Sequence, residues 1–281
     1  SPLPLDVVRK SGQDWHVTLQ PAKGSPLMTA WPDGSDLSPL LPPGTDPTES
    51  PETGGWLSEE NLNDYLTGKG FAPTPSEDLF LREARFGIAM NYEKGRPRDQ
   101  MLYQAEFVRP KAGVGLLVLL GTATQLPMEK GILRIGGEAK SAYYQQLKNS
   151  QVSVSAGLQN IPIRFKLVLL TPAWFSGGWQ PASGDAGWST LLGCTVTLKA
   201  AAFGRPQRIG GWDIAAGWHK PMRHYVPAGS VYFFERPGEA ANPVPSPQRS
   251  ISETPQGELP LDAQGFGYAA IGKWEWLDHS Q

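Results

Sequence analysis

The stretch GGWDIAAGWHKPMRHYVPAGSVYFF, residues 210–234, joins a glycine-rich, charged segment to an apolar run. Its last part lies within GSVYFFERP, residues 229–237, and is aromatic and β-branched, which favours a buried strand. The first part gathers Asp, His, Lys and Arg side chains behind two glycines. These residue types allow three interpretations: an active site, a cradle for a phosphate backbone, or a loop that precedes a core strand.

Similar apolar runs recur along the chain and predict a fold made mainly of strands. Two of them, RFGIAMNYE and QMLYQAEFVR, are joined by the turn-forming segment KGRPRD, a pattern that predicts a hairpin. Residues 113–123 are expected to form a buried strand, and further apolar runs lie at residues 163–175, 189–204 and 265–276. One amphipathic helix is predicted within residues 56–70, where Ser58 can cap the start and Gly68 can end it. Strands with few helices indicate the α+β class.

Composition limits the classes of function. The 281 residues carry a formal net charge of −2, so nucleic-acid binding would depend on local basic patches rather than on overall charge. With 32 glycines and 27 prolines, the chain is expected to be rich in loops, the longest at residues 20–55 and 237–263. The single cysteine, Cys194, excludes an internal disulfide framework and a multi-cysteine metal site, and is expected to be a buried structural thiol.

Targeting signals are not visible in the sequence. No apolar run reaches the roughly 18 residues of a membrane-spanning helix, and the opening segment SPLPLDVVRK lacks the pattern of a signal peptide. This segment also lacks an initiator methionine and resembles a cut end, so we expect an N-terminal portion to precede it. A lone cysteine fits a reducing compartment, and the expected location is the cytoplasm.

Catalytic chemistry has little support in the residue pattern. His219 and His224 are five residues apart, and Pro221 lies between them. Two histidines that bind a metal from one helix are four residues apart, and a proline between them would break the helix. An acid–base ribonuclease pair made from these histidines and Lys220 is chemically possible, and two exposed loop histidines are the alternative. Asp213 is expected to be a turn or cap residue. The chain contains no phosphate-binding loop, dinucleotide fingerprint or nucleophile elbow.

Two basic stretches favour a polyanionic ligand. Residues 199–224 have a charge balance of +4, from five basic side chains and one acid, and residues 82–98 have a balance of +3, from five basic side chains and two acids. Glycines let backbone N–H groups approach phosphate closely, and lysine and arginine neutralise it. Four aromatic side chains are candidates for stacking on unpaired bases: Trp179, Trp212, Trp218 and Phe266. The alternative is a solvated charged face with aromatic residues in the core.

The motif RIGG occurs twice, at residues 134–137 and 208–211, and a turn-like stretch with a Lys follows each copy. Together with these copies, six segments resemble the family of the third subunit of the Cmr complex. In order along the chain, they are PLPLDVV, REARFGIAMN, LRIGGEAK, LLTPAWFSGGWQP, AAFGRPQRIGGWDIAAGWHKPMRHYVPAGSVYFF and GFGYAAIGKW. That family belongs to the Cas five group of the RAMP superfamily, in type III-B CRISPR effector complexes.

The resemblance implies an α+β fold of two ferredoxin-like, RRM-related domains with long Pro/Gly-rich insertions, residues 1–125 and residues 126–281, the first without its N-terminal portion. It implies a non-catalytic subunit, without cofactor or metal, that anchors the 5′ tag of the CRISPR guide RNA. The implied partners are that guide RNA, the large polymerase/cyclase-like subunit, the backbone RAMP subunits and, indirectly, the target RNA, with no membrane partner. Two alternatives remain: a RAMP endoribonuclease that processes the guide precursor with His219 or His224 as base, and a tryptophan-rich carbohydrate-binding module.

Candidate RNA-binding residues come from the basic stretches and from the resemblance. They are Arg85, Arg96, Gly136, Gly137, Lys140, Arg208, Gly210, Gly211, Lys220, Arg223, His224, Gly265, Phe266 and Gly267. Each candidate also has an alternative role. The glycines could serve only turn geometry, Arg85 could pair with Glu83, and Phe266 could lie in the core. Replacement of Lys220 and Arg223 with alanine is expected to weaken assembly with guide RNA without removing a chemical step.

Overall fold

The structure is a computed structural model of the chain. It describes residues 1–10, 16–23, 37–43, 48–51, 54–91, 93, 95–118, 120, 128–135, 140–147, 158, 160–213, 215–237, 244–245 and 250–278. Strands predominate and helices are few in these residues, which confirms the predicted α+β class. No helix in the described part of the chain has both the length and the apolar composition needed to cross a membrane.

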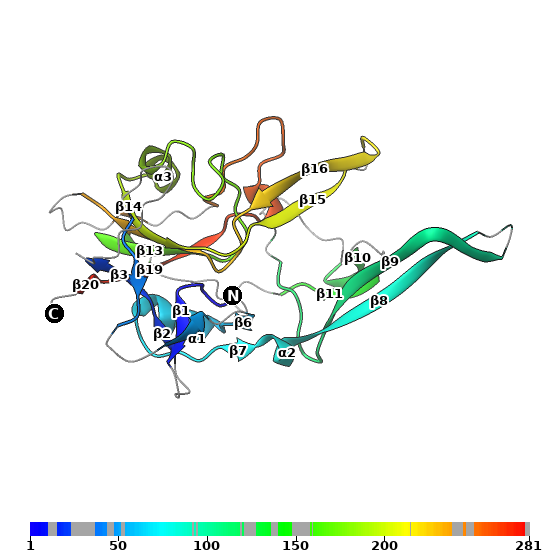
Figure 1. The fold of residues 1–281 in the computed structure, drawn as a ribbon, viewed down its shortest axis with the longest axis horizontal. Coiled ribbons are helices and arrows are strands. Elements are labelled where there is room, and N and C mark those ends of the chain that lie inside the picture. The colour runs from blue at the N-terminus through cyan, green and yellow to red at the C-terminus, as the bar shows by residue number, and fades with distance from the viewer. Residues whose placement is uncertain are drawn as a thin grey trace. The chain divides into compact units, whose positions relative to one another are not determined.

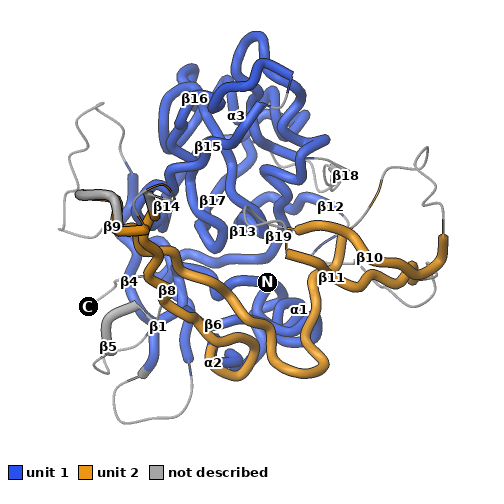
Figure 2. The backbone as a smooth tube through the Cα atoms, turned by 90° about the vertical axis from the view of Figure 1, so that its right-hand side faces the viewer, with its two compact units in different colours: residues 1–76, 156–281 blue, residues 77–155 orange. Residues whose placement is uncertain are grey.

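The chain divides into two compact units (Figure 2). Unit 1 comprises residues 1–76 and 156–281, and unit 2 comprises residues 77–155. Unit 2 is therefore inserted in sequence between the two parts of unit 1. The predicted domain boundary between residues 125 and 126 lies outside the described residues and stays a prediction.

A four-stranded antiparallel sheet forms the centre of unit 1 (Figure 1). Its strands are β13 (Arg164–Leu169), β14 (Thr197–Ala202), β17 (Val231–Glu235) and β19 (Ala269–Lys273), in the order β14-β17-β13-β19. The interpretation of residues 229–237 as a buried strand is confirmed by β17. Since β13 pairs with both β17 and β19, the sheet joins segments that are far apart in sequence.

The apolar run at residues 189–204 is divided between a helix and a strand. Helix α3 (Asp185–Leu192) is followed by Gly193, whose φ of 70° is the left-handed conformation that favours glycine and ends a helix. Strand β14 follows, and Asp185 Oδ1 accepts a hydrogen bond from Leu198 N at 2.9 Å, which ties the start of the helix to the strand. Cys194 is half-buried between the two elements, and burial raises the pKa of its thiol, so the neutral thiol is favoured.

Both faces of the central sheet are buried, which explains why its strands read as continuous apolar runs. Side chains alternate between the faces along β17. Tyr232 and Phe234 pack in a cluster with residues of α3, whereas Val231 and Phe233 pack in a second cluster with residues of α1 (Glu59–Thr67). One helix therefore covers each face of the sheet.

The predicted helix within residues 56–70 is confirmed as α1. Ser58 Oγ accepts a hydrogen bond from Asn61 N at 3.1 Å, and Gly68 ends the helix with a φ of 80°. The buried face of α1 consists of Leu62, Tyr65 and Leu66. Gly272 of β19 allows the helix to approach closely, because a Cβ there would lie 2.9 Å from the Leu66 side chain.

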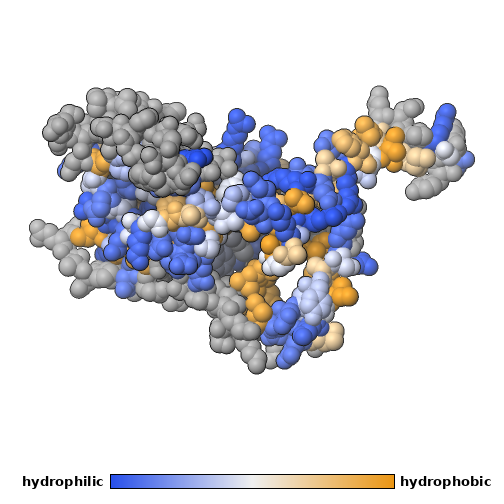
Figure 3. Space-filling model, turned by 90° about the horizontal axis from the view of Figure 1, so that it is seen from below, coloured by the Kyte–Doolittle hydropathy of each residue, from blue (hydrophilic) through white to orange (hydrophobic). Residues whose placement is uncertain are grey.

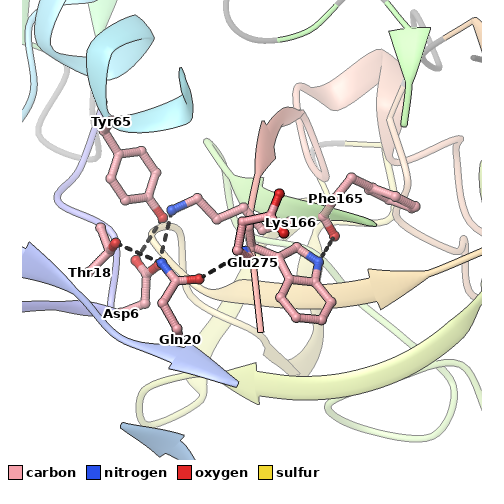
Figure 4. A network of polar contacts seen from close by, with 8 residues as sticks. Asp6, Thr18, Gln20, Tyr65, Phe165, Lys166 and Glu275 are labelled. Carbon is pink, nitrogen blue, oxygen red and sulfur yellow. Dashed lines mark hydrogen bonds and ion pairs between the residues drawn. The ribbon is translucent and has the colours of Figure 1, made fainter. Parts of the chain in front are cut away.

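A buried polar network links three distant segments of unit 1 (Figure 4). Lys166 Nζ of β13 lies 3.2 Å from Asp6 Oδ2, and the Tyr65 hydroxyl of α1 donates to Asp6 Oδ1 at 2.7 Å. Lys166 Nζ also lies 3.6 Å from the centroid of the Tyr65 ring. Burial lowers the pKa of Lys166, and the Asp6 carboxylate acts in the opposite direction. Burial, with the charge of the same carboxylate, raises the pKa of Tyr65 well above its usual value.

Short strands and one 3₁₀ helix, η2 (Asp262–Gln264), complete the sheet-based part of unit 1. The pairs are β1 (Val7–Lys10) with β2 (His16–Thr18) and β5 (Thr48–Pro51), β3 (Gln20–Lys23) with β4 (Leu40–Leu41) and β20 (Leu277–Asp278), β6 (Gly55–Trp56) with β7 (Thr74–Pro75), and β12 (Asn160–Ile161) with β18 (Val244–Pro245). Segment 20–55, expected to be a loop, thus contains short strands in its described part. Prolines in such a segment are compatible with short edge strands and keep them from extending.

Unit 1 also carries a hairpin of β15 (Gln207–Asp213) and β16 (Trp218–Tyr225), which runs outward from the end of the central sheet (Figure 1). The interpretation of the glycine-rich first part of residues 210–234 as a loop that precedes a core strand is therefore wrong. Both arms of this segment are strands in antiparallel register, and residues 215–217 between them form a turn. The paired glycines obscured the strand because glycine is depleted in strands generally.

The described part of unit 2 contains two hairpins. After α2 (Ser76–Leu79), β8 (Phe80–Asn91) pairs with β9 (Arg96–Pro110), and β10 (Lys130–Ile135) pairs with β11 (Lys140–Gln145). The predicted hairpin of residues 85–109 is confirmed and is longer than expected.

The predicted buried strand at residues 113–123 is wrong in its described part. Residues 113–118 form no strand, and the side chains of Leu116, Leu117 and Val118 are exposed. Gly113, with a φ of 82°, turns the chain immediately before this run. An apolar run forms a buried strand only where another strand pairs with it, and no described strand pairs with these residues.

Candidate nucleic-acid interface

The β15–β16 hairpin is shaped by its turn and by one bulge. Asp213 Oδ1 accepts hydrogen bonds from Ala215 N at 2.9 Å and from Ala216 N at 3.0 Å, and Gly217 adopts a φ of 61°. The expectation that Asp213 is a turn residue is confirmed. Further along, the register shifts between the pairs of Ile209 and Gly211, where the second strand contains one extra residue. Such a bulge accommodates a proline in β16 that cannot donate to the ladder.

The register places basic and aromatic side chains along the hairpin. Arg208 is opposite His224, and Trp212 is opposite His219. The indole rings of Trp212 and Trp218 are 60% and 64% exposed, and the Trp218 ring contacts the His219 ring with centroids 4.5 Å apart. Two large flat faces are therefore available to a ligand, in the part of the hairpin near its turn.

Two cations of the hairpin are not neutralised. Within the described residues, neither the Arg208 guanidinium nor the Lys220 ammonium has an ion-pair or hydrogen-bond partner, and both side chains are exposed. Arg223 behaves differently, because its Nη2 lies 2.6 Å from Glu258 Oε1 and its guanidinium lies 5.7 Å from the centroid of the Trp174 ring. Arg223 therefore fixes the base of the hairpin, and its charge is already compensated.

Gly210 and Gly211 leave a short stretch of exposed backbone between these side chains. Neither glycine has a positive φ, so turn geometry does not require glycine at these positions. A Cβ at Gly211 would lie no nearer than 3.7 Å, to Lys220 Cδ, and one at Gly210 would lie 3.4 Å from the Met222 side chain. The absence of side chains lets a phosphate approach the strand closely.

The three candidate residues of the closing loop support the base of the hairpin. Gly265 ends η2 with a φ of 85°, and Phe266 packs against Tyr225 at a centroid distance of 4.9 Å. Gly267 has a φ of 74°, and a Cβ there would lie 2.3 Å from Ser250 Oγ. Phe266 is half-buried and belongs to neither of the two described core clusters. The contribution of these residues to RNA binding stays a prediction.

Unit 2 holds the remaining candidates. Arg85 Nη2 lies 3.1 Å from Glu83 Oε2, which confirms the alternative that these side chains pair, and the guanidinium also lies over the Phe107 ring at 4.8 Å. Lys140 Nζ lies 5.7 Å from the same ring centroid. Arg96 is exposed at the start of β9.

The described parts of the two RIGG copies each lie in the first strand of a hairpin. Gly136 and Gly137 lie outside the described residues, but Arg134 and Ile135 end β10, the first strand of the β10–β11 hairpin. The second copy, residues 208–211, lies in β15, the first strand of the β15–β16 hairpin. In both hairpins a Lys of the second strand follows, Lys140 in β11 and Lys220 in β16.

The hydrogen bonds of His219 and His224 bear on the ribonuclease alternative. Within the described residues, no carboxylate or imidazole forms a hydrogen bond with His219 or His224. No group of three or more His, Cys, Asp or Glu side chains in that part of the chain is arranged to hold a metal ion. The residue pattern missed Glu258 and Trp174, the partners of Arg223, because each is more than 30 residues away from it and no local signal marks such a contact.

Comparison with known proteins gives one family and a set of solved structures. A family model described as CRISPR-associated protein (Cas_Cmr3) matches residues 2–274. No curated protein matches the chain. A cryo-EM structure of the type III-B Cmr-beta bound to cognate target RNA and AMPPnP, state 1, contains a chain that is 13% identical over 81% of this chain and 64% of its own length, with a TM-score of 0.39. A cryo-EM structure of the type III-B Cmr-beta bound to cognate target RNA contains one that is 14% identical over 82% of this chain and 65% of its own length, with a TM-score of 0.41. The chain thus spans slightly less than two thirds of the chains to which it is similar.

Proposed function

This chain belongs to the Cmr3 family of CRISPR-associated proteins, and we propose that it is a non-catalytic RNA-binding subunit of a type III-B effector complex whose β15–β16 hairpin contacts the guide RNA. The part of the guide that it anchors is the repeat-derived 5′ tag. The large polymerase/cyclase-like subunit and the backbone RAMP subunits are its protein partners, and the target RNA is a partner through them.

One observation carries the proposal: an exposed hairpin combines two exposed indole rings with two cations that have no partner among the described residues. Arg208 and Lys220 supply charge for phosphates, and Trp212 and Trp218 supply faces on which unpaired bases stack. Indole rings stack on bases of any sequence, and the bare backbone of Gly210 and Gly211 admits a phosphate. This combination suits single-stranded RNA better than a duplex, whose bases are already stacked.

The topology of unit 1 supports the family fold. The chain order is strand, helix, strand, strand, strand, formed by β13, α3, β14, β17 and β19. Their spatial order, β14-β17-β13-β19, places the third strand beside the first and the fourth strand at the other edge. This is the arrangement of a ferredoxin-like domain in which the segment before the last strand holds a 3₁₀ helix instead of a full helix. We therefore propose that this sheet is one ferredoxin-like domain.

The salt dependence of RNA binding tests the proposal. The purified chain is titrated with single-stranded RNA that carries a repeat-derived 5′ tag, at several salt concentrations. Each phosphate contact contributes about 0.7 to the slope of log K against log salt for single strands, so Arg208→Ala with Lys220→Ala is expected to lower the slope by about 1.4. Lys69→Ala is the matched control, because Lys69 is an exposed cation at the end of α1 that pairs with Asp64 at 3.6 Å.

Two results would contradict the proposal. One is an unchanged salt slope and affinity in the Arg208→Ala/Lys220→Ala variant. The other is metal-independent cleavage of guide precursor by the isolated chain that disappears in His219→Ala or His224→Ala, since this would make the subunit an endoribonuclease.

A further inference from the structure

The orientation of the β15–β16 hairpin decides where the unpaired cations of unit 1 lie. Figure 3 shows hydrophobic residues along the elongated hairpin of unit 2, whose cation Arg82 is paired with Glu106 at 2.5 Å. Arg208 and Lys220, which have no partner among the described residues, lie on the β15–β16 hairpin instead. A two-stranded hairpin by itself is at best marginally stable in water. The orientation of this hairpin therefore depends on the contacts at its base.

One contact at the base joins the hairpin to residues 250–267. Glu258 in this segment is half-buried, and its Oε1 accepts a hydrogen bond from Arg223 Nε at 2.8 Å and lies 2.6 Å from Arg223 Nη2. Both nitrogens belong to one rigid guanidinium plane, so together they fix the direction of the side chain as well as its distance. The side chains of Arg223 and Glu258 are only 30% and 29% exposed, and solvent therefore screens this pair less than a fully exposed one.

The same segment also fixes the aromatic ring that Arg223 contacts. The Arg223 guanidinium lies 5.7 Å from the centroid of the Trp174 ring. Trp174 N donates to Ser252 Oγ at 2.9 Å, and that hydroxyl lies 3.1 Å from Trp174 O, to which it donates. Residues 250–267 thus hold both partners of Arg223, the carboxylate directly and the ring through its backbone. Arg223, Glu258 and Trp174 are called the clamp below.

Arg223 lies on the same face of the hairpin as Lys220. Arg223 is opposite Ile209 in the register, and Lys220 is opposite Gly211. Residues two apart in a strand share a face, and so do directly paired residues of an antiparallel ladder. A freed Arg223 would therefore add a cation on the side of Lys220. Glu258 thus has two opposite effects, because it withholds one cation from a polyanion and also holds the hairpin that carries the others.

We propose that Glu258 is a positioning residue for RNA binding. Through the clamp it holds the β15–β16 hairpin in the orientation in which Arg208 and Lys220 meet single-stranded RNA. This inference rests on the proposed function, because it takes the RNA site from there. Positioning is the larger of the two effects, because the orientation of the hairpin governs two cations and two indole rings at once, whereas Arg223 stays against Trp174 at the base.

The experiment is a double-mutant cycle in the purified full chain, titrated with single-stranded RNA that carries the repeat-derived 5′ tag, at several salt concentrations. Glu258→Ala raises the net charge by one, Arg223→Ala lowers it by one, and the double variant leaves it unchanged. A charge effect alone would strengthen binding in the first, weaken it in the second and cancel in the third. Loss of the clamp is expected to weaken binding in all three by a similar factor, because each variant breaks the same contact.

The expected loss follows from the strength of the ion pair. A pair of this exposure shifts a conformational equilibrium by about three- to fivefold, and apparent affinity falls in proportion to the competent fraction. The slope of log K against log salt is expected to stay at its wild-type value in Glu258→Ala, because the molecules that bind contact the same phosphates. Glu235→Ala is the matched control and is expected to bind RNA as the wild type does. It breaks the pair with Lys199, whose side chains are 33% and 29% exposed, and changes the net charge equally.

Hydrogen exchange reports on the hairpin without RNA. Amides of β15 and β16 are expected to exchange about three- to fivefold faster in free Glu258→Ala than in the wild type, because the hairpin opens locally more often. Amides of the central sheet serve as the internal reference and are expected to be unchanged, as is the melting temperature. Faster exchange in the hairpin and the central sheet alike, with a lower melting temperature, would show a general stabilising role and overturn the inference.

Three further results would overturn the positioning role. Tighter RNA binding by Glu258→Ala, with a salt slope increased by about 0.7, would make Glu258 a competitor of phosphate for Arg223. Wild-type affinity in the double variant would leave a charge effect alone. Equal exchange of β15 and β16 in Glu258→Ala and the wild type would mean that other contacts hold the hairpin.

Failure of the proposed function gives a different result. Unchanged RNA affinity and salt slope in Arg208→Ala/Lys220→Ala would remove the RNA site itself. Weaker binding by that variant, with wild-type binding by Glu258→Ala, would leave the RNA site intact and remove only the positioning role of Glu258.

Discussion

Replacement of Asp6 with Asn removes one charge from the most deeply buried polar network of unit 1. Asp6 is fully buried, and its carboxylate accepts hydrogen bonds from the Lys166 ammonium at 3.2 Å and the Tyr65 hydroxyl at 2.7 Å. Asparagine has nearly the same volume and can still accept from Tyr65. The substitution therefore tests the charge with little change in packing, and it leaves Lys166 buried without a counter-ion.

The expected cost is large on the scale of protein stability. Removal of one partner from a buried ion pair typically costs about 3–5 kcal/mol, whereas a whole domain is stable by about 5–15 kcal/mol. Asp6→Asn combined with Lys166→Met is expected to recover most of this loss, because no uncompensated charge remains. The exposed pair of Arg82 and Glu106 gives the contrast, and Glu106→Gln is expected to cost at most about 1 kcal/mol.

The stability deficit of Asp6→Asn is also expected to depend on pH. Burial lowers the pKa of Lys166 below its usual value of 10.5, and the Asp6 carboxylate opposes that effect, so Asp6→Asn lowers this pKa further. Between the folded and the unfolded pKa of Lys166 the unfolded chain binds more protons, and stability rises with pH by up to about 1.4 kcal/mol per unit. The rise begins at lower pH in the variant, so its deficit shrinks from pH 7 towards pH 9.

Urea unfolding followed by tryptophan fluorescence measures this deficit. All 10 tryptophans lie in residues 1–76 or 156–281, so the signal reports unit 1 alone. Unfolding curves of the wild type and the variants are compared at pH 7 and pH 9. A deficit below about 1 kcal/mol at pH 7, or one that grows between pH 7 and pH 9, would refute the reasoning.

Further substitutions test the fold and the hairpin. Gly267→Ala places a Cβ 2.3 Å from Ser250 Oγ at a φ of 74°. It is expected to lower the free energy of unfolding in urea by at least about 1–3 kcal/mol. Gly211→Ala is the control and is expected to be tolerated, because the atom nearest to its Cβ would lie 3.7 Å away. Trp212→Ala with Trp218→Ala is expected to weaken binding of single-stranded RNA by about 1–3 kcal/mol per stacked base in anisotropy titrations, with an unchanged melting temperature. Trp274→Phe removes an indole N–H that donates to two strand carbonyl oxygens, both at 3.0 Å, and is expected to lower stability by about 1–3 kcal/mol in the same urea assay.

Local sequence signals were sufficient to predict those helices and strands whose own residues favour one structure. Helix α1 was predictable because Ser58 and Gly68 act on the backbone beside them, and β17 because aromatic and β-branched residues cluster within one short run. The β8–β9 hairpin was predictable from turn residues between two apolar runs. In each example the deciding interaction joins residues near in sequence.

The candidate site was only partly predictable for the same reason. The sequence shows the basic and aromatic residues of the site, but it does not show which of the basic side chains form ion pairs with acidic ones. Arg208 and Lys220 remain available, while Arg223 is compensated by Glu258, which is 35 residues further along. The exposure of Leu116, in an apolar run that resembles a buried strand, likewise depends on whether another strand covers it.

The sequence by itself determined the α+β class, the positions of α1, β13, β17 and β19, and the family to which the chain is similar, because residue types and short-range patterns carry that information. Only the tertiary structure decided that residues 207–225 form a hairpin, which cations of that hairpin are uncompensated, and that Asp6 neutralises Lys166 across 160 residues of chain. Contacts between distant segments depend on how the chain is folded in space, and no spacing along the sequence encodes them.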